Sequence, residues 1–156
     1  METDVFSINE ICEKAIAIGK EISSIDLDYS VNSLRNLETI IQSVRSLNAK
    51  GMLNDVTCWN AAVCLGVYLG EVMLRDHLRS MGYTWRADDS GLLMLMDREN
   101  RNAISPISKV HKKLANTGSE SDGEGTVSSF YSVSLMLAAV GGEDKISKRL
   151  DISTVR

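Results

Sequence analysis

The segment at residues 64–78, CLGVYLGEVMLRDHL, places one carboxylate in the middle of an apolar stretch. Glu71 stands four residues before Arg75, which is the favourable order for an ion pair on a helix. Its other neighbours on that helix face are apolar, and an acid in such surroundings can also serve as a general acid or base. The sequence leaves three roles open for Glu71: a structural ion pair or hydrogen-bonded buried acid, a contact to a partner or ligand, and catalysis.

The remaining patterns that could support catalysis or metal binding are weak. A general acid or base works with a second group, and no second carboxylate shares the helix face of Glu71, because Asp76 points elsewhere. His77 and His111 have no other ligand-type residue at a metal-binding spacing. The acidic loop SESDGEG, residues 119–125, lacks the calcium-loop pattern, and no phosphate-binding, GxSxG or HExxH motif occurs. We therefore predict no catalytic residue, no metal and no cofactor.

A ligand site near Glu71 would draw on neighbouring side chains. Tyr68 and Arg75 would then stand with Glu71 at the mouth of a pocket. Trp85 belongs to a predicted strand that also carries Tyr83, and aromatic side chains in such positions belong to the core more often than to a stacking surface. The alternative interpretation of the chain is therefore a small-ligand-binding protein or an enzyme that uses Glu71 and Arg75.

Three lysines, Lys109, Lys112 and Lys113, form a basic face on a predicted helix. Such a face is typical of a solvated helix flank, and a binding site for an acidic partner is the alternative. The formal net charge of −4 gives the chain no general attraction to phosphate backbones or anionic lipid. We therefore predict that the protein binds neither nucleic acid nor membranes.

The chain as a whole has the properties of one soluble domain. Its 156 residues suffice for a core, and 44% are hydrophobic and 24% charged. Three cysteines, Cys12, Cys58 and Cys64, lie among apolar residues and cannot all pair within one chain, which indicates reduced, buried thiols. The first twenty residues contain acids and no apolar signal core, and the longest uncharged apolar run, residues 61–70, is about half of what a bilayer requires. A cytoplasmic location is expected.

Periodicity and capping residues predict five helices and three strands. The helices are expected at residues 7–22, from Ser30 or Asn32 to Gly51, at 56–80 with Asp55 as N-cap, from Pro106 with Ser105 as cap to Gly118, and at 127–140 with Thr126 as cap. The strands are expected near residues 83–87, 92–96 and 103–105, as an antiparallel meander. Because residues 92–96 are continuously apolar, we expect both faces of that strand to be covered.

Two glycines, Gly66 and Gly70, interrupt the interior of the third predicted helix. Each costs a helix about 1 kcal/mol relative to alanine. Such positions usually let another backbone approach closely, and the sheet or the last helix is the expected neighbour. A homodimer face is the alternative.

Three sequence blocks resemble a family of small bacterial proteins that has no agreed enzymatic activity. The blocks are LDYS with a following SLxxLE (residues 27–30 and 33–38), LGVYLGEV (residues 65–72), and PISKVHKKL with SFY (residues 106–114 and 129–131). The resemblance implies an α+β fold with a small sheet flanked by helices. Some members of the family look like immunity or accessory proteins.

Together these observations predict a single α+β domain over residues 1–142, with about five helices packed on a small three-stranded antiparallel sheet. Residues 143–156 are expected to form a polar, frayed C-terminal tail. The expected function is non-catalytic binding of another protein, such as a toxin or an assembly component. A homodimer with a structural role is a third possibility.

Overall fold

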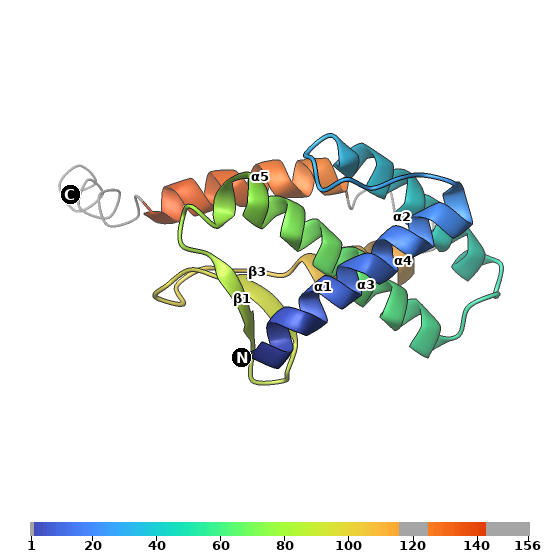
Figure 1. Ribbon diagram of the computed structural model, residues 1–156, viewed down its shortest axis with the longest axis horizontal. Helices are drawn as coiled ribbons and strands as arrows, with labels where there is room; N and C mark the ends of the chain where they lie inside the picture. The colour runs from blue at the N-terminus through green and yellow to red at the C-terminus, as the bar shows by residue number, and fades with distance from the viewer. Residues whose placement is uncertain (1, 116–124, 143–156) are drawn as a thin grey trace, which may run out of the picture.

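The computed structural model of the protein describes residues 2–115 and 125–142, and these form an α+β fold with five α-helices and one three-stranded antiparallel sheet (Figure 1). The predicted fold class is confirmed. The predicted tail and all of the acidic loop except Gly125 lie outside the described residues. The elements, in chain order, are α1 (Glu2–Ile18), the π-helical turn η1 (Gly19–Ser23), α2 (Ser33–Ala49), α3 (Asp55–Met73), the π-helical turn η2 (Leu74–Leu78), β1 (Thr84–Ala87), β2 (Leu93–Met96), β3 (Ala103–Ile104), α4 (Pro106–Ala115) and α5 (Val127–Gly142).

Helix α3 runs through the middle of the molecule. Helix α1 crosses one of its faces and α4 packs on the other, while α5 lies along α2 and η2 (Figure 1). Every residue from Leu65 to Met73 is buried, as expected for a helix that is apolar on all sides. The segment Asp55–Leu78 is also long and apolar enough to cross a membrane, but 67% of its most apolar window is buried inside the fold, as in a core helix.

Side-chain caps fix where the helices begin. Ser30 Oγ accepts from the Ser33 amide at 3.1 Å, Ser105 Oγ from Ser108 at 3.3 Å, and Thr126 Oγ1 from Ser129 at 3.0 Å. The caps at Ser105 and Thr126 were expected from the sequence and are confirmed. For α2 the sequence offered Ser30 or Asn32, and the structure has Asn32 at the N-cap position while Ser30 makes the side-chain hydrogen bond. Together these hydrogen bonds determine where α2, α4 and α5 start.

Both ends of α3 differ from the prediction. Its N-cap is Asn54, whose Oδ1 accepts from the Thr57 amide at 2.7 Å, rather than Asp55. The α-helical hydrogen bonding stops at Met73 and continues as η2, in which the Arg79 amide donates to the Leu74 carbonyl five residues earlier at 3.0 Å. Gly82, at φ +93°, then turns the chain into β1, as the sequence indicated.

The sheet has the order β1-β2-β3 and presents one apolar face to the helices. The register places Trp85 opposite Leu95 and Leu95 opposite Ile104, so these three side chains form a row on that face. Leu95 is fully buried, but Leu93, Met94 and Met96 are only partly buried. The prediction that both faces of this strand are covered is therefore confirmed only in part, because Met94 and Met96, on the face opposite Leu95, keep partial exposure.

The glycines of α3 let two other elements approach its axis closely. A β-carbon on Gly66 would lie 2.5 Å from the Ile107 Cα of α4. A β-carbon on Gly70 would collide with the Trp85 ring and lie 3.2 Å from Pro106 Cγ. The close packing expected from the sequence is confirmed. The sheet is one predicted neighbour, but the helix involved is α4 rather than the last helix.

We predict that filling either site destabilises the fold. Gly66→Ala and Gly70→Leu should each lower the free energy of unfolding by about 1–3 kcal/mol, because overpacking outweighs the gain in helix propensity. Ser46→Ala, at an exposed position of α2, is the control and should stay within about 0.5 kcal/mol of the unsubstituted protein. Urea denaturation measures all three, and a Gly66→Ala protein as stable as the unsubstituted one would contradict the close packing.

Candidate functional site

Glu71 lies under the surface at the C-terminal end of α3 and is 5% exposed. Its Oε2 accepts a hydrogen bond from Trp85 Nε1 at 2.8 Å and lies 3.7 Å from Arg79 Nη2. Its Oε1 accepts from Arg75 Nε at 3.4 Å, so the expected ion pair is formed. Arg75 of η2, Arg79 just after η2 and Trp85 of β1 thus all point at the Glu71 carboxylate. Through Trp85 this contact holds the sheet against α3.

The two arginines of this cluster reach the surface. The Arg75 side chain is 42% exposed and that of Arg79 is 58% exposed, so water screens both ion pairs. The Arg75 guanidinium also lies over the Tyr29 ring, 3.7 Å from its centroid. The shielded hydrogen bond between Trp85 and Glu71 therefore contributes more to stability than either ion pair.

Tyr68 does not stand at the mouth of a pocket, and that prediction is wrong. Its side chain is fully buried, because it is the point where the chain between η1 and α2 is attached to α3. The phenol oxygen accepts from the Tyr29 amide at 2.8 Å and shares a hydrogen bond with Ser33 Oγ at 2.7 Å. Burial raises the pKa of Tyr68 above its ordinary value, so the phenol stays protonated and serves as an anchor.

The three lysines of α4 do not form one solvated face, so this prediction is also wrong. Lys113 is buried and its ammonium lies 2.9 Å from Glu38 Oε2 while donating to the Gly125 carbonyl at 2.6 Å. Lys109 is partly buried, with its ammonium 5.9 Å from the Phe130 ring centroid, and only Lys112 is exposed. The physical reason is that α2 and α5 pack against this side of α4.

Glu38 joins three elements through this buried pair. Its Oε1 accepts from the Val127 amide at 3.0 Å, at the start of α5. Burial alone would raise the pKa of Glu38, but hydrogen bonds from Gln42, the Val127 amide and Lys113 together hold that pKa below the ordinary value. The carboxylate therefore links α2, α4 and α5 in its charged form.

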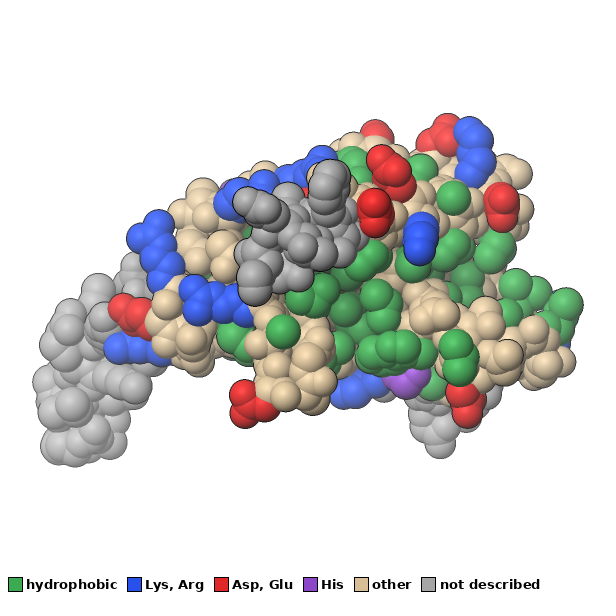
Figure 2. Space-filling model, turned by 60° about the horizontal axis from the view of Figure 1, so that its bottom comes forward, with side chains coloured by type: hydrophobic (Ala, Val, Ile, Leu, Met, Phe, Trp, Pro, Cys, Tyr) green, Lys and Arg blue, Asp and Glu red, His purple; other side chains and the backbone are tan. Residues whose placement is uncertain are grey.

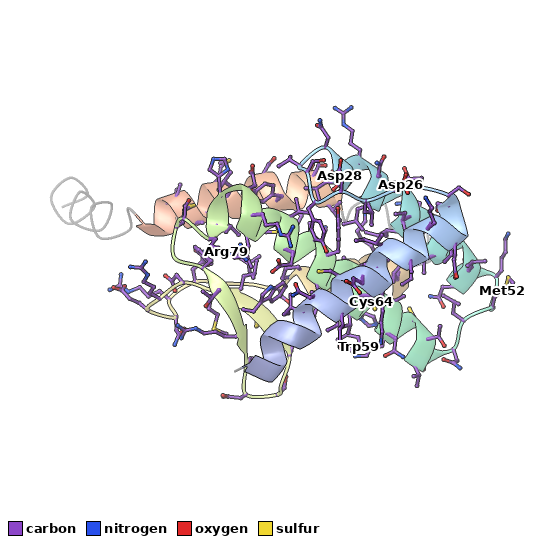
Figure 3. The ribbon with its side chains drawn as sticks, in the orientation of Figure 1. Asp26, Asp28, Met52, Trp59, Cys64 and Arg79 are labelled. Carbon is purple, nitrogen blue, oxygen red and sulfur yellow. The ribbon has the colours of Figure 1, made fainter. Side chains whose placement is uncertain are left out.

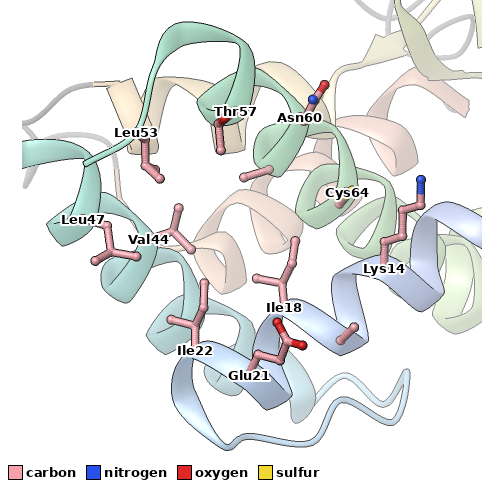
Figure 4. A pocket seen from close by; sticks show the side chains of 12 residues that line it. Lys14, Ile18, Glu21, Ile22, Val44, Leu47, Leu53, Thr57, Asn60 and Cys64 are labelled. Atoms are coloured by element: carbon pink, nitrogen blue, oxygen red, sulfur yellow. The ribbon is translucent and has the colours of Figure 1, made fainter. Parts of the chain in front are cut away.

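An open apolar cavity of about 390 Å³ lies between α1, α2 and the first half of α3, and we call it the α1–α3 groove (Figure 4). The loop before α3 and the turn η1 close its ends. The apolar lining consists of Ala17, Ile18, Ile22, Val44, Leu47, Leu53 and Ala61. The groove lies at the opposite end of α3 from the Glu71 cluster, as the positions of Met52 and Arg79 show (Figure 3).

Polar groups are confined to a few positions of the groove. Lys14 and Glu21 line it from one side, and within the described residues neither forms an ion pair. Thr57 and Asn60 line it from α3. Burial raises the pKa of the Cys64 thiol, and the charge of Lys14 opposes this shift only in part. The groove therefore offers an apolar floor between one positive and one negative side chain.

Exposed apolar side chains occur in the lining and next to lining residues in the chain. Ile22 is 42% exposed within the lining. Met52 is 66% exposed and Val56 69% exposed, and they adjoin the lining residues Leu53 and Thr57 in the chain. A face with several large, exposed apolar side chains around an open cavity is typical of an interaction site.

A second, open cavity of about 420 Å³ lies on the other side of α3. It is lined by the α3 residues Trp59 and Val63, by Ile107, by residues 90–92 before β2 and by Leu93 at the start of β2. The Trp59 ring meets the His111 ring edge-on at 5.0 Å. Figure 2 shows hydrophobic side chains gathered near the centre of one face of the molecule, beside a histidine, with charged side chains around them. Within the described residues, no cluster of three or more His, Cys, Asp or Glu side chains has metal-binding geometry.

Comparisons with known proteins support the fold. No family model matches the sequence, and a search of curated proteins finds no match. A crystal structure of a protein from Bacteroides thetaiotaomicron VPI-5482 is similar, with 14% sequence identity and a TM-score of 0.60. The match covers 86% of this chain and 45% of that one, so this chain spans less than half the length of its structural neighbour. At this identity the similarity shows the fold alone.

The α1–α3 groove was not anticipated from the sequence. Its apolar residues have the helical spacing of ordinary core positions, and they come from four separate segments. The one signal in the sequence is size: Ala17, Ala61 and Cys64 are small residues on the facing helices, and small side chains leave space between helix backbones.

We predict that the Glu71 cluster is structural. Glu71→Leu should lower the free energy of unfolding by about 1–3 kcal/mol, because the Trp85 indole N–H loses its acceptor. Glu71→Gln should cost less, since the amide oxygen still accepts that hydrogen bond. In a Trp85→Phe background the cost of Glu71→Leu should fall, which a double-mutant cycle by urea denaturation measures. A Glu71→Leu protein more stable than the unsubstituted one would instead indicate an acid kept for function.

A second prediction concerns the buried lysine. Lys113→Met should cost about 3 kcal/mol, because it leaves Glu38 without its cation. Lys112→Met, at the exposed neighbouring position, is the matched control and should cost less than about 0.5 kcal/mol.

The same pair determines how the stability depends on pH. Because the folded-state pKa of Glu38 is lowered, its contribution is complete above the ordinary value of 4.5 and is lost as the pH falls through the folded pKa. In Lys113→Met the pKa of Glu38 is lowered less. The difference in free energy of unfolding between this variant and the unsubstituted protein should therefore become smaller in acid. If this difference in free energy of unfolding stays constant from neutral pH to pH 3, the pair of Glu38 and Lys113 contributes nothing to the pH dependence of stability.

Proposed function

We propose that this protein is a non-catalytic protein-binding module that takes apolar side chains of a partner protein into the α1–α3 groove. The observation that carries this proposal is the open apolar cavity of about 390 Å³, whose lining includes the 42% exposed Ile22. Removing such side chains from water is the main source of affinity at protein interfaces.

The shape and charge of the groove specify the kind of partner. It runs between helices, so an amphipathic helix that presents apolar side chains along one face fits it best. Lys14 and Glu21 lie seven residues apart on the same side of α1 and η1. We therefore expect the partner helix to carry an acid where it passes Lys14 and a base where it passes Glu21.

A non-catalytic role is supported by what the potentially reactive groups do. Both oxygens of Glu71 accept hydrogen bonds from positioned donors, and the Tyr68 phenol is enclosed in the core. Neither of the two cavities is lined by these residues. The resemblance of three sequence blocks to small bacterial proteins, some of them immunity-like, supports a cytoplasmic partner such as a toxin or an assembly component.

Binding of a small apolar molecule in the same groove is the second candidate. The observation in its favour is the volume, because cavities of about 300–1,000 Å³ are typical of small-molecule sites. Such a ligand would copurify with the protein without a partner protein.

We predict that two substitutions in the groove abolish partner binding without unfolding the protein. Thr57→Trp fills the groove from an exposed position, and Ile22→Glu places a charge in its apolar lining at a side chain that is 42% exposed. Val31→Glu is the control, since Val31 is an exposed apolar residue on the chain segment before α2. A partner captured by the unsubstituted protein should be retained by the control and lost from both groove variants, and its purified helix should bind with the same ranking in calorimetry.

Labelling of Cys64 locates the binding event. In the native protein a thiol reagent should modify Cys64 alone, because Cys12 and Cys58 are buried and burial raises the pKa of Cys12 to about 12. Bound partner should protect Cys64. A partner that binds equally well to both groove variants would contradict the proposed site, and an apolar small molecule extracted from the purified protein would favour the second candidate.

A further inference from the structure

Two arginines at the C-terminal end of α3 share one carboxylate. Arg75 and Arg79 follow Glu71 at intervals of four residues, so the three side chains lie on the same side of the helix. Arg75 Nε lies 3.4 Å from Glu71 Oε1, and Arg79 Nη2 lies 3.7 Å from Oε2. Among the described residues, no other acid forms an ion pair with either arginine. Two guanidinium groups, which are always charged, therefore face a single negative charge, and one positive charge is left unbalanced.

The neighbouring acidic groups do not supply the missing negative charge. Asp76 Oδ2 accepts from the Tyr131 hydroxyl at 2.5 Å, on the side of η2 that α5 covers. Asp28 Oδ1 accepts from the Ser30 amide at 3.0 Å in a turn of its own. Burial raises the pKa of the Tyr29 phenol to about 12, so this nearby ring is neutral. The unbalanced positive charge is therefore available at the surface, where both arginine side chains are exposed.

The Arg75 guanidinium is held in a fixed orientation. Its carbon lies 3.7 Å from the centroid of the Tyr29 ring, and its Nε donates to Glu71 Oε1 at 3.4 Å. A guanidinium carries several N–H donors, and only the Nε donor is used by the described residues. The two terminal amino groups are therefore free to donate to a ligand, and the side chain does not have to be ordered first.

The ring beside Arg75 is placed there by a strained backbone. Tyr29 has φ +68°, in the left-handed region that a bulky side chain rarely adopts. Its amide donates to the Tyr68 hydroxyl at 2.8 Å, and the two rings pack with their centroids 5.1 Å apart. The core thus maintains an unfavourable conformation that brings an aromatic ring to the arginine. Backbone strain of this kind is concentrated at ligand sites.

We propose that Arg75 and Arg79 together bind a carboxylate group of a ligand at the C-terminal end of α3. A carboxylate brings one negative charge, which balances the charges of the cluster. A phosphate monoester at neutral pH brings nearly two and leaves an excess. The two oxygens of a carboxylate also match the paired donors at the edge of a guanidinium. Glu71 is a positioning residue, because its own oxygens are occupied and it orients both arginines.

This carboxylate site is separate from the α1–α3 groove, because Arg79 lies at the opposite end of α3 from Met52 (Figure 3). The chain has a net charge of −4 and does not attract anions in general, so binding of a small anion requires a local arrangement. The inference goes beyond the proposed function, and either can fail without the other.

Titration of the full chain with sodium acetate at neutral pH, followed by nuclear magnetic resonance, tests the site. The Nε–H signals of Arg75 and Arg79 should shift and saturate, while sodium chloride at equal ionic strength should leave them unchanged. Inorganic phosphate at equal ionic strength should bind more weakly than acetate. A short peptide with blocked ends and a single glutamate distinguishes the source of the carboxylate. Tighter binding than acetate assigns the site to an acidic side chain of a protein, and equal binding assigns it to a small free acid.

Substitutions at exposed positions locate the binding. Arg75→Met and Arg79→Met should each weaken acetate binding by about tenfold or more, because each removes charge-assisted hydrogen bonds to the anion. Arg35→Met, at an exposed position of α2, is the matched control and should bind acetate like the unsubstituted protein.

The hydrogen bond from Trp85 to Glu71 reports on the fold around the site, and the indole N–H signal should stay protected from solvent exchange in every variant. In folded variants, acetate binding that survives both arginine substitutions would overturn the site, as would signals that respond equally to acetate and chloride. Tighter binding of phosphate than of acetate would overturn the assignment to a carboxylate.

Discussion

The absence of a β-carbon at two positions of α3 determines how the rest of the molecule is assembled. Ile107 of α4 occupies the space beside Gly66, and the Trp85 ring occupies the space beside Gly70. The residue after Gly70 is Glu71, which accepts the indole hydrogen bond of the same ring. Two adjacent residues thus admit the tryptophan and hold it in place. Because Trp85, Leu95 and Ile104 form one row across the sheet, this contact positions all three strands.

Carboxylates at the junctions between elements complete this arrangement. Glu71 connects the helical core to β1, Glu38 connects α2 to α4 and α5, and Asp76 connects η2 to α5 through the Tyr131 hydroxyl. The hydrogen bond from Tyr131 lowers the pKa of Asp76, so this acid also acts in its charged form. Each of these acids has a defined hydrogen-bonding partner in the folded chain. Exposed apolar side chains lie elsewhere, among them Ile22 in the α1–α3 groove and four side chains on α5.

Local sequence patterns predicted the parts of this structure that local forces determine. The apolar spacing of α2, the caps at Ser105 and Thr126, and the close packing of Gly66 and Gly70 follow from residue type and position. Features that depend on several distant segments could not be predicted in this way. The sequence around Lys113 is typical of a solvated helix flank. Only the packing of α2 and α5 on α4 shows that Lys113 is buried. The alternative interpretation of the sequence placed Tyr68 at a pocket, and only its hydrogen bonds to Tyr29 and Ser33, in the chain before α2 and at its start, show why it is buried. The groove depends on how four segments pack together, and its small side chains are the only sign of it in the sequence.

The π-helical turn at Leu74–Leu78 has a consequence for how related sequences should vary. Such a turn contains one residue more than an α-helical turn would need. Because the wider turn absorbs this residue, a chain with a one-residue deletion between Met73 and Arg79 would form a regular α-helical turn there and keep the residues after it in nearly the same orientation. A one-residue deletion in the regular part of α3 would instead rotate everything after it by roughly 100°. In an alignment, gaps should therefore be found in this turn rather than within α3, and a sequence with such a gap can still carry the arginine beside the Glu71 carboxylate.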